Sequence, residues 1–350
     1  MKRTVILLVL ISANAHSTES CFSNNKAILE LIRASEELDE CFATDKDPCK
    51  LKKKSIDFQA NVNSSRLIPL NRMAGDKFMN RTTGVISVKF GKYDGVNSEK
   101  QFAGSAQKIS RCHIIAPAHL IYTDGDFPLE SRNFSLTFKT GQTCDIKYPF
   151  ENEVKASLFF KMTDKKRGDF GCKSETYNHA CEKRLFRGSS DVVILKLDSF
   201  DKNDDSYFRL DTSTPIFKEG GQRINCWGYT SKIGLENVTS DESRMYLWTH
   251  KDARKYGDNL GKSFDGVLTN AVSRKGMSGG GCADSDNPRV LVGLYVNDNK
   301  SGGDAGIYIN PNDVFYAHPN YLAAFHKLAE RYAETNAGKR LSDLDLQCTQ

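Results

Sequence analysis

The sequence predicts an all-β protein built from antiparallel sheets, and three observations support this prediction. Short runs rich in β-branched and aromatic residues recur from about residue 82 onward. Gly, Asp, Asn and Ser separate these runs, as is usual for turns. The runs do not alternate with helical segments, so the βαβ units of a parallel sheet are not indicated. Many short strands with frequent turns favour a sandwich or a barrel.

Composition and charge are those of an ordinary globular protein. The chain has 350 residues, of which 39% are hydrophobic and 27% are charged, enough for one large domain or two smaller ones. The formal net charge is +5, and the two signs are interspersed without a basic stripe or a nucleic-acid-binding motif. We therefore expect no nucleic acid among the partners, and the oligomeric state stays open.

The first residues have the pattern of a secretory signal peptide. Lys2 and Arg3 precede the apolar run Val5–Ile11, and the small residues of ANA at 13–15 fit a signal-peptidase site. We expect a signal peptide over residues 1–15 and a secreted or periplasmic protein. The apolar run is too short to span a bilayer, and no later segment is long enough, so no membrane span is expected.

Ten cysteines follow the expected cleavage point, and an even number in an exported chain indicates disulfides. The rival interpretation is a zinc site, which requires closely spaced ligand pairs. The chain has no C-x2-C pair and no histidine placed to complete such a site. We therefore expect no metal and no cofactor, and most of the pairings stay open.

The elements follow one another in a simple order. Residues 16–81 are expected to form a helical extension or a removable pro-segment, because apolar residues in 24–42 recur at near-helical spacing. The β-rich runs come next: TGVISVKFG, KISRCHIIAPAH, NFSLTFKTG, VKASLFFKM, DVVILKLD, GQRINCWGYT, RMYLWTH, RVLVGLYVN and AGIYIN. One amphipathic helix with Gly338 as its stop is predicted near the end by Leu322, Phe325, Leu328 and Tyr332.

The stretch Gly276-Met277-Ser278-Gly279-Gly280 surrounds one hydroxyl with glycines. A serine needs a base to become a nucleophile, and the oxyanion that forms on attack needs hydrogen-bond donors. Glycine tolerates the backbone bends that aim N–H groups at one point. A chance glycine-rich surface loop is the alternative interpretation.

His119 ends the apolar run HIIAPAH, and a histidine that titrates near neutral pH is the usual base for a serine. His113 begins the same run and is the competitor, interpreted as a strand-end histidine with a local hydrogen bond. Asp191 stands directly before the strand VVILKL and is placed to orient an imidazole and stabilise its charged form. An aspartate that closes a turn is the alternative interpretation for Asp191.

Taken in the order His119, Asp191, Ser278, these motifs resemble those of the trypsin/chymotrypsin-like serine endopeptidases. APAH stands where that family has T-A-A-H, DVVILKLD where it has D-I-A-L-L-K-L, and GMSGGG where it has G-D-S-G-G-P. CWGYT, VLVGLYVN and AGIYIN are weaker matches in the same order. The resemblance covers roughly residues 82 to 335.

The resemblance implies two antiparallel six-stranded β-barrels with the active site between them. Residues 82–205 would form the first barrel, with His119 and Asp191, and residues 206–316 the second, with Ser278. Residues 317–350 would form the C-terminal helix and tail. It also implies a polypeptide substrate, a Ser-His-Asp triad, and an oxyanion hole made by the N–H groups of Gly276 and Ser278. A disulfide between Cys226 and Cys282 is implied in the same way.

The sequence departs from the family at several positions. Met277 replaces an aspartate that pairs with a new N-terminus in zymogen members, so we expect no activation by that ion pair. Leu120 and Arg274 replace cysteines. The implied substrate pocket, lined by Val272, Val296, Asp298 and Gly306, has an apolar base, although Asp298 or Asp304 would change that if either points inward. No preference for the residue before the cleaved bond is predicted.

Two other functions remain open on the sequence alone. A catalytically silent protease-like protein that only binds a partner would have the same motifs. Gly276-x-Ser278-x-Gly280 also fits the G-x-S-x-G string of the α/β-hydrolases, but that motif requires a strand, an elbow and a helix, whereas β-rich runs flank it here.

Overall fold

The computed structural model describes the β-rich region and the C-terminal helix of the chain. The described residues are 68–69, 77–90, 100–121, 134–140, 145–147, 150, 153–161, 191–212, 222–230, 244–255, 267–269, 276–298, 320–335, 337–341 and 344–348. The predicted signal peptide and the predicted helix over 24–42 lie outside them. Among the described residues, no helix has the length and apolar character needed to cross a membrane.

The first β-body is a closed antiparallel barrel of six strands in the order β2-β3-β4-β8-β7-β5. Its strands are β2 (Thr83–Phe90), β3 (Lys100–Lys108), β4 (His113–Ala116), β5 (Phe134–Thr140), β7 (Val154–Lys161) and β8 (Val193–Leu197). Alternate β-branched and aromatic residues, such as Ile86, Val88 and Phe138, fill its interior. The prediction of a six-stranded antiparallel barrel in this part of the chain is confirmed.

The second β-body is a nine-stranded sheet whose main path runs β1-β11-β10-β13-β14-β15-β12. The strands are β1 (Ile68–Pro69), β6 (Asp145–Lys147), β9 (Arg209–Leu210), β10 (Gln222–Thr230), β11 (Arg244–Lys255), β12 (Val267–Thr269), β13 (Gly281–Asp284), β14 (Asn287–Asp298) and β15 (Asn320–Ala324). A pairing of Lys255 with Thr269 also links β11 to β12. This single residue pair is what would close the sheet into a barrel. The second six-stranded barrel therefore stays a prediction.

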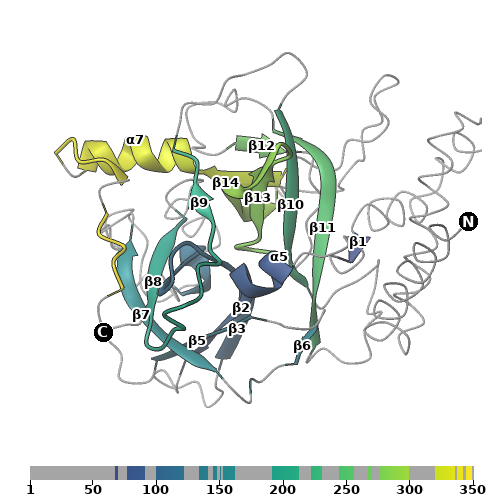
Figure 1. Ribbon diagram of the computed structural model, residues 1–350, viewed down its shortest axis with the longest axis vertical. Coiled ribbons are helices and arrows are strands. Elements are labelled where there is room, and N and C mark those ends of the chain that lie inside the picture. Colours follow the sequence, from purple (N-terminus) through teal and green to yellow (C-terminus); the bar gives the residue numbers. More distant parts are fainter. Residues whose placement is uncertain are drawn as a thin grey trace, which may run out of the picture.

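One apolar cluster joins the two bodies. It contains Val85 and Ile194 from the barrel together with Trp227, Leu294 and Phe325 from the sheet and the helix that follows it. The short helix α5 (Lys77–Thr82) lies between the two bodies in Figure 1, directly before β2. The barrel and the sheet therefore share a core rather than meeting only through polar side chains.

The predicted C-terminal helix is present as α7 (Phe325–Thr335), but it begins later than the apolar spacing suggested. Leu322 belongs to β15, where it pairs with Val267 and with Tyr295. Strand and helix both bury apolar residues here, so the spacing alone did not separate them. After α7, the Gly338 N–H donates to the Ala333 carbonyl at 2.8 Å, which closes the helix near the predicted stop.

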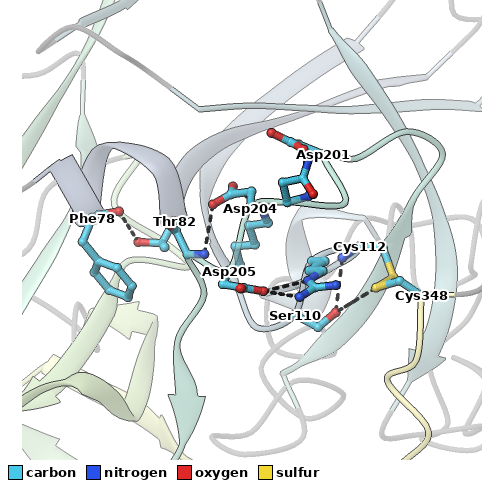
Figure 2. Close-up of polar contacts among 12 residues, drawn as sticks. Phe78, Thr82, Ser110, Cys112, Asp201, Asp204, Asp205 and Cys348 are labelled. Atoms are coloured by element: carbon cyan, nitrogen blue, oxygen red, sulfur yellow. Dashed lines mark hydrogen bonds and ion pairs between the residues drawn. A yellow bond between two sulfur atoms is a disulfide. The ribbon is translucent and has the colours of Figure 1, made fainter.

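The C-terminal tail returns to the barrel, where a disulfide joins Cys348 to Cys112 at the start of β4 (Figures 1 and 2). Leu344 and Leu346 of this tail pack against the shared core. A second disulfide joins Cys226 to Cys282 on the adjacent strands β10 and β13. All the cysteines among the described residues are paired in these two bonds.

Candidate active site

The pairing of β4 with β8 brings His119 and Asp191 to the same end of the barrel. The two strands are antiparallel, with Ala116 opposite Val193. His119 lies three residues after Ala116, in the short 3-10 helix η3 (Ala118–Leu120), and Asp191 lies two residues before Val193. The end of one antiparallel strand is beside the start of the other, so residues 72 apart in sequence become neighbours.

Asp191 binds His119 through both of its carboxylate oxygens. The Nδ1 atom of the His119 ring lies 2.7 Å from Oδ2, and the backbone N–H of His119 donates to Oδ1 at 2.8 Å. An ionised carboxylate only accepts hydrogen bonds, so Nδ1 must carry the proton. In the neutral ring, Nε2 therefore carries the lone pair that a base needs.

Burial differs sharply between the two partners. The Asp191 side chain is 3% exposed, whereas the His119 side chain is 31% exposed. The carboxylate is thus withdrawn from water with the imidazole and a backbone N–H as its partners. The imidazole ring is partly exposed at the surface.

The loop that carries Ser278 is a tight turn built on glycine. The Gly280 N–H donates to the Met277 carbonyl at 2.7 Å, and Gly279 has φ +84°, the sign that a type II turn requires at its third residue. Gly276 also has a positive φ, +97°. Both values lie in the region that L side chains rarely adopt, which explains why glycine occupies these two positions.

This loop packs against the barrel beside the helix that carries His119. A Cβ atom on Gly279 would lie 1.9 Å from the Ser105 carbonyl oxygen and 2.7 Å from Cδ of Pro117, two residues before His119. A Cβ atom on Gly104 would lie 2.4 Å from Cδ1 of Leu120 and 3.0 Å from the Ser278 carbonyl oxygen. The backbone of Ser278 and the neighbours of His119 therefore touch the same short part of β3.

The backbone N–H groups of the loop fall into two classes. The Gly279 N–H donates to the Tyr295 carbonyl, and the Gly280 N–H donates to Met277, both at 2.7 Å. The N–H groups of Gly276, Met277 and Ser278 have no acceptor among the described residues. These three include the two donors that the family resemblance implies for an oxyanion hole.

The predicted pocket residues are only partly described. Val296 is buried in β14, on the strand that holds the Ser278 loop through Tyr295. Asp298 pairs with Asn320 at the end of β14, and its side chain lies outside the described part of the structure. Val272 and Gly306 also lie outside it. The pocket that these four residues would line therefore stays a prediction.

The departures at positions 120 and 277 have simple structural consequences. Leu120 is buried against Gly104, so an apolar contact occupies the place where the family would have a cysteine. The Met277 side chain is fully buried. A buried thioether at that position packs as an apolar group and offers no charge to a new N-terminus.

Three buried polar residues that were not predicted from the sequence lie behind this site: Ser105 and Gln107 bond to the Ser278 loop, and Thr83 bonds to Gln107. Thr83, Ser105 and Gln107 come from β2 and β3, and all three are fully buried. Ser105 and Gln107 are two residues apart and so share one face of β3. Both residues lie on the outer face of the barrel, opposite to Ala106 in the barrel interior, and the second body covers that face. Because β3 was not among the predicted strands, no sequence signal identified them.

Comparisons with known proteins were made by sequence and by structure. No family model and no curated protein matches the chain. Among solved structures, the chain is similar to the inactive form of the Rv3671c protease, with 12% identity and a TM-score of 0.39 over 77% of this chain and 97% of that one. The active form of that protease, from M. tuberculosis, has 13% identity and a TM-score of 0.39 over 78% and 90%. A Glu endopeptidase has 13% identity and a TM-score of 0.40 over 72% and 90%.

Proposed function

We propose that this protein is an exported serine endopeptidase that hydrolyses peptide bonds through an acyl-enzyme. The observation that carries the proposal is the doubly bound Asp191–His119 pair, with the glycine-lined Ser278 loop packed beside the same 3-10 helix. A buried carboxylate, an imidazole in a fixed tautomer and a serine hydroxyl are the three parts of a serine hydrolase triad.

The reaction follows from the roles of these groups. The Oγ atom of Ser278 attacks the peptide carbonyl while Nε2 of His119 removes its proton, and Asp191 stabilises the imidazolium that forms. The N–H groups of Gly276 and Ser278 bind the negative oxygen of the tetrahedral intermediate. His119 then donates its proton to the leaving amine, and water attacks the acyl-enzyme by the same route in reverse. The proposal requires no metal or cofactor.

We propose that the two bodies of the fold carry different catalytic groups. The first barrel, over residues 82–205, supplies the base and its carboxylate, and the second body, over residues 206–316, supplies the nucleophile and the substrate pocket. The two disulfides are compatible with an extracellular or periplasmic protein. We propose export through the leader at residues 1–15.

The substrate pocket is proposed to lie along β14, lined by Val272, Val296, Asp298 and Gly306. Val296 is apolar and buried. An apolar base would disfavour a charged substrate side chain unless Asp298 or Asp304 points inward, because burying an unpaired charge is costly, so the preference has to be measured. A library of peptides would measure this preference.

A fluorophosphonate probe tests the proposed function directly, because it reacts with an activated serine hydroxyl. We expect the wild-type protein to be labelled, and peptide mapping should place the label on Ser278. The Ser278→Ala variant should not be labelled, and His119→Ala should react at least about 10²-fold more slowly. Equal labelling of the wild type and Ser278→Ala would end the enzyme hypothesis in favour of a protein that only binds a partner.

A further inference from the structure

We propose that Gln107 is a positioning residue that orients the oxyanion-binding N–H of Ser278 without touching the substrate, an inference that rests on the proposed function. The side-chain amide of Gln107 is fully buried between the barrel and the Ser278 loop. Its Nε2 atom donates to the Gly279 carbonyl oxygen at 2.9 Å. Gln107 thus holds the residue next to the nucleophile from the opposite body of the protein.

The orientation of the Gln107 amide is determined by its other end. Its Oε1 atom accepts from the Thr83 hydroxyl at 2.7 Å and from the Trp227 indole N–H at 3.0 Å. An amide oxygen has two lone pairs, and both are used here. A flipped amide would direct its oxygen at the Gly279 carbonyl oxygen and its NH₂ at the Trp227 N–H, which can only donate, so only one orientation satisfies the site.

Two planar peptide units connect Gln107 to the proposed oxyanion donor. The Gly279 carbonyl and the Gly280 N–H belong to one peptide unit, so the bond from Gln107 orients both. The Gly280 N–H in turn donates to the Met277 carbonyl at 2.7 Å. The Met277 carbonyl shares its peptide unit with the Ser278 N–H. Turning the first unit therefore turns the N–H that would bind the oxyanion.

Ser105 binds two further carbonyls of the same loop. Its backbone N–H donates to the Ser278 carbonyl at 2.7 Å, and its hydroxyl donates to the Gly276 carbonyl at 3.3 Å. The Ser105 hydroxyl also accepts from the Tyr229 N–H at 2.8 Å. Ser105 and Gln107 of β3 thus bind three carbonyls of the nucleophile loop. Of these bonds, the one from Gln107 to the Gly279 carbonyl is linked through the Gly280 and Met277 peptide units to the Ser278 N–H.

The test compares Gln107→Met with Thr83→Val as a matched control. Methionine keeps the length of the side chain but removes both the donor to Gly279 and the acceptor for Thr83 and Trp227. Thr83→Val removes two buried hydrogen bonds, one to Gln107 and one from the Trp227 N–H, and leaves Gln107 bound to Trp227. Inactivation by the fluorophosphonate probe separates a maximal rate, kinact, from a binding constant, KI. For Gln107→Met we expect kinact to fall about 10- to 10²-fold with KI changed less than about threefold. For Thr83→Val we expect kinact to stay within about threefold of the wild type.

A second variant keeps the test valid if Gln107→Met does not fold. Glutamate at position 107 donates to Gly279 only when it is protonated, and it repels that carbonyl when it is ionised. We expect the ratio of kinact for Gln107→Glu to kinact for the wild type, taken at each pH, to fall as the pH rises. The ratio at each pH removes the effects of pH that the two proteins share.

The possible outcomes separate the two proposals. A wild-type protein that the probe does not label overturns the proposed function and this inference together. Labelling of the wild type with an unchanged kinact for Gln107→Met overturns only the role of Gln107. Two other results would also overturn the positioning role of Gln107, because they indicate a merely structural role. The first is an equal fall of kinact in Gln107→Met and Thr83→Val. The second is a kinact ratio for Gln107→Glu that does not change with pH.

Discussion

His113 begins the buried strand β4, and His119 lies in the short helix η3 that follows it. The surroundings of the two histidines are nevertheless opposite. His119 has a carboxylate on Nδ1 and a ring that reaches the surface. The His113 ring is fully buried, and its Nδ1 atom lies 2.8 Å from the Ser110 hydroxyl. That hydroxyl already accepts the backbone N–H groups of Cys112 and His113, so its proton is directed at Nδ1. The environment, not the residue type, separates a candidate base from a structural histidine.

The variant Asp191→Asn should lose activity with little change in shape. An asparagine amide that donates to Nδ1 of His119 would place the ring proton on Nε2, where a base needs a lone pair. Under the proposed function, we expect kinact of the fluorophosphonate probe to fall about 10⁴-fold. Asp198→Asn, at the exposed far end of β8, is the control and should react at the wild-type rate. Comparable rates for both variants would contradict the role given to Asp191.

His113 should make the protein less stable below neutral pH. Burial lowers the pKa of His113, Lys196 lowers it further by charge repulsion, and Asp345 opposes them. Below about pH 6.5 the unfolded chain therefore takes up a proton that the folded protein does not, so the free energy of unfolding falls as pH falls until the folded pKa is reached. His113→Asn keeps a polar atom near Ser110 but does not titrate. Its urea unfolding should show a weaker pH dependence in this range, and an unchanged dependence would refute the prediction.

At the scale of single elements, the cap that follows helix α7 places an alanine in the left-handed backbone conformation, which alanine does not favour. Ala337 has φ +53° and Gly338 has φ +80°, just after the last helical residue. The bond from the Gly338 N–H to Ala333, five residues back, is the signature of a Schellman cap, whose left-handed residue is usually glycine.

Ala337→Gly should therefore stabilise the protein. Glycine relieves the strain of the left-handed backbone, which we expect to raise the free energy of unfolding by roughly 0.5–1 kcal/mol. Ala329→Gly, inside α7, is the control and should lower it by about 1 kcal/mol, because glycine weakens a helix interior. Urea denaturation measures both changes, and a loss of stability in both variants would contradict the assignment of the cap.

The short helix α5 argues against activation by cleavage near Thr82. Thr82 and Thr83 are fully buried, the Thr82 hydroxyl donates to the Phe78 carbonyl (Figure 2), and the Phe78 ring meets Phe208 edge-on with centroids 5.0 Å apart. Arg289 also lies over the Phe78 ring. Cleavage at this point would remove a helix that packs against the shared core.

We therefore expect active protein to keep residues 77–82. The protein that reacts with the fluorophosphonate probe can be isolated and its N-terminus sequenced. The terminus should precede Lys77. If reaction requires a terminus near Thr82, the expectation is wrong. The new N-terminus would then activate the protein through a contact other than an ion pair with residue 277, because Met277 carries no charge.

At the scale of the whole molecule, three connections hold the barrel and the sheet together. They share an apolar core, they share the polar network around Gln107, and the C-terminal tail crosses from α7 to the barrel (Figure 1). The Cys112–Cys348 disulfide ends this tail and spans 236 residues of sequence. Because the bond lies at the start of β4, it ties the C-terminus to the strand that leads to His119.

The double variant Cys112→Ser/Cys348→Ser should be less stable than the wild type. Removing a crosslink between distant residues increases the freedom of the unfolded chain, and the loss is typically about 2–5 kcal/mol. Urea denaturation of the two proteins, both prepared under oxidising conditions, measures this change. An unchanged midpoint would show that the packing of Leu344 and Leu346 holds the tail without the disulfide.

The sequence by itself determined the local features of this protein. Periodicity and turn residues located five of the six barrel strands, and β3, which carries Ser105 and Gln107, was not among the predicted runs. Apolar spacing located α7, and the glycines around Ser278 indicated a bent loop. These signals come from the preferences of neighbouring residues, so they can be read without knowing the fold. Where two local structures bury the same side chain, as at Leu322, the sequence did not choose between them.

Only the tertiary structure decided which distant residues meet. The register of β4 against β8 pairs His119 with Asp191, the return of the tail pairs Cys112 with Cys348, and the packing of β3 on the Ser278 loop pairs Gln107 with Gly279. A hydrogen bond or a disulfide depends on separations of a few ångströms, and chain connectivity does not determine these across long stretches of sequence. The folded core sets them, and with them the chemistry that we propose for this site.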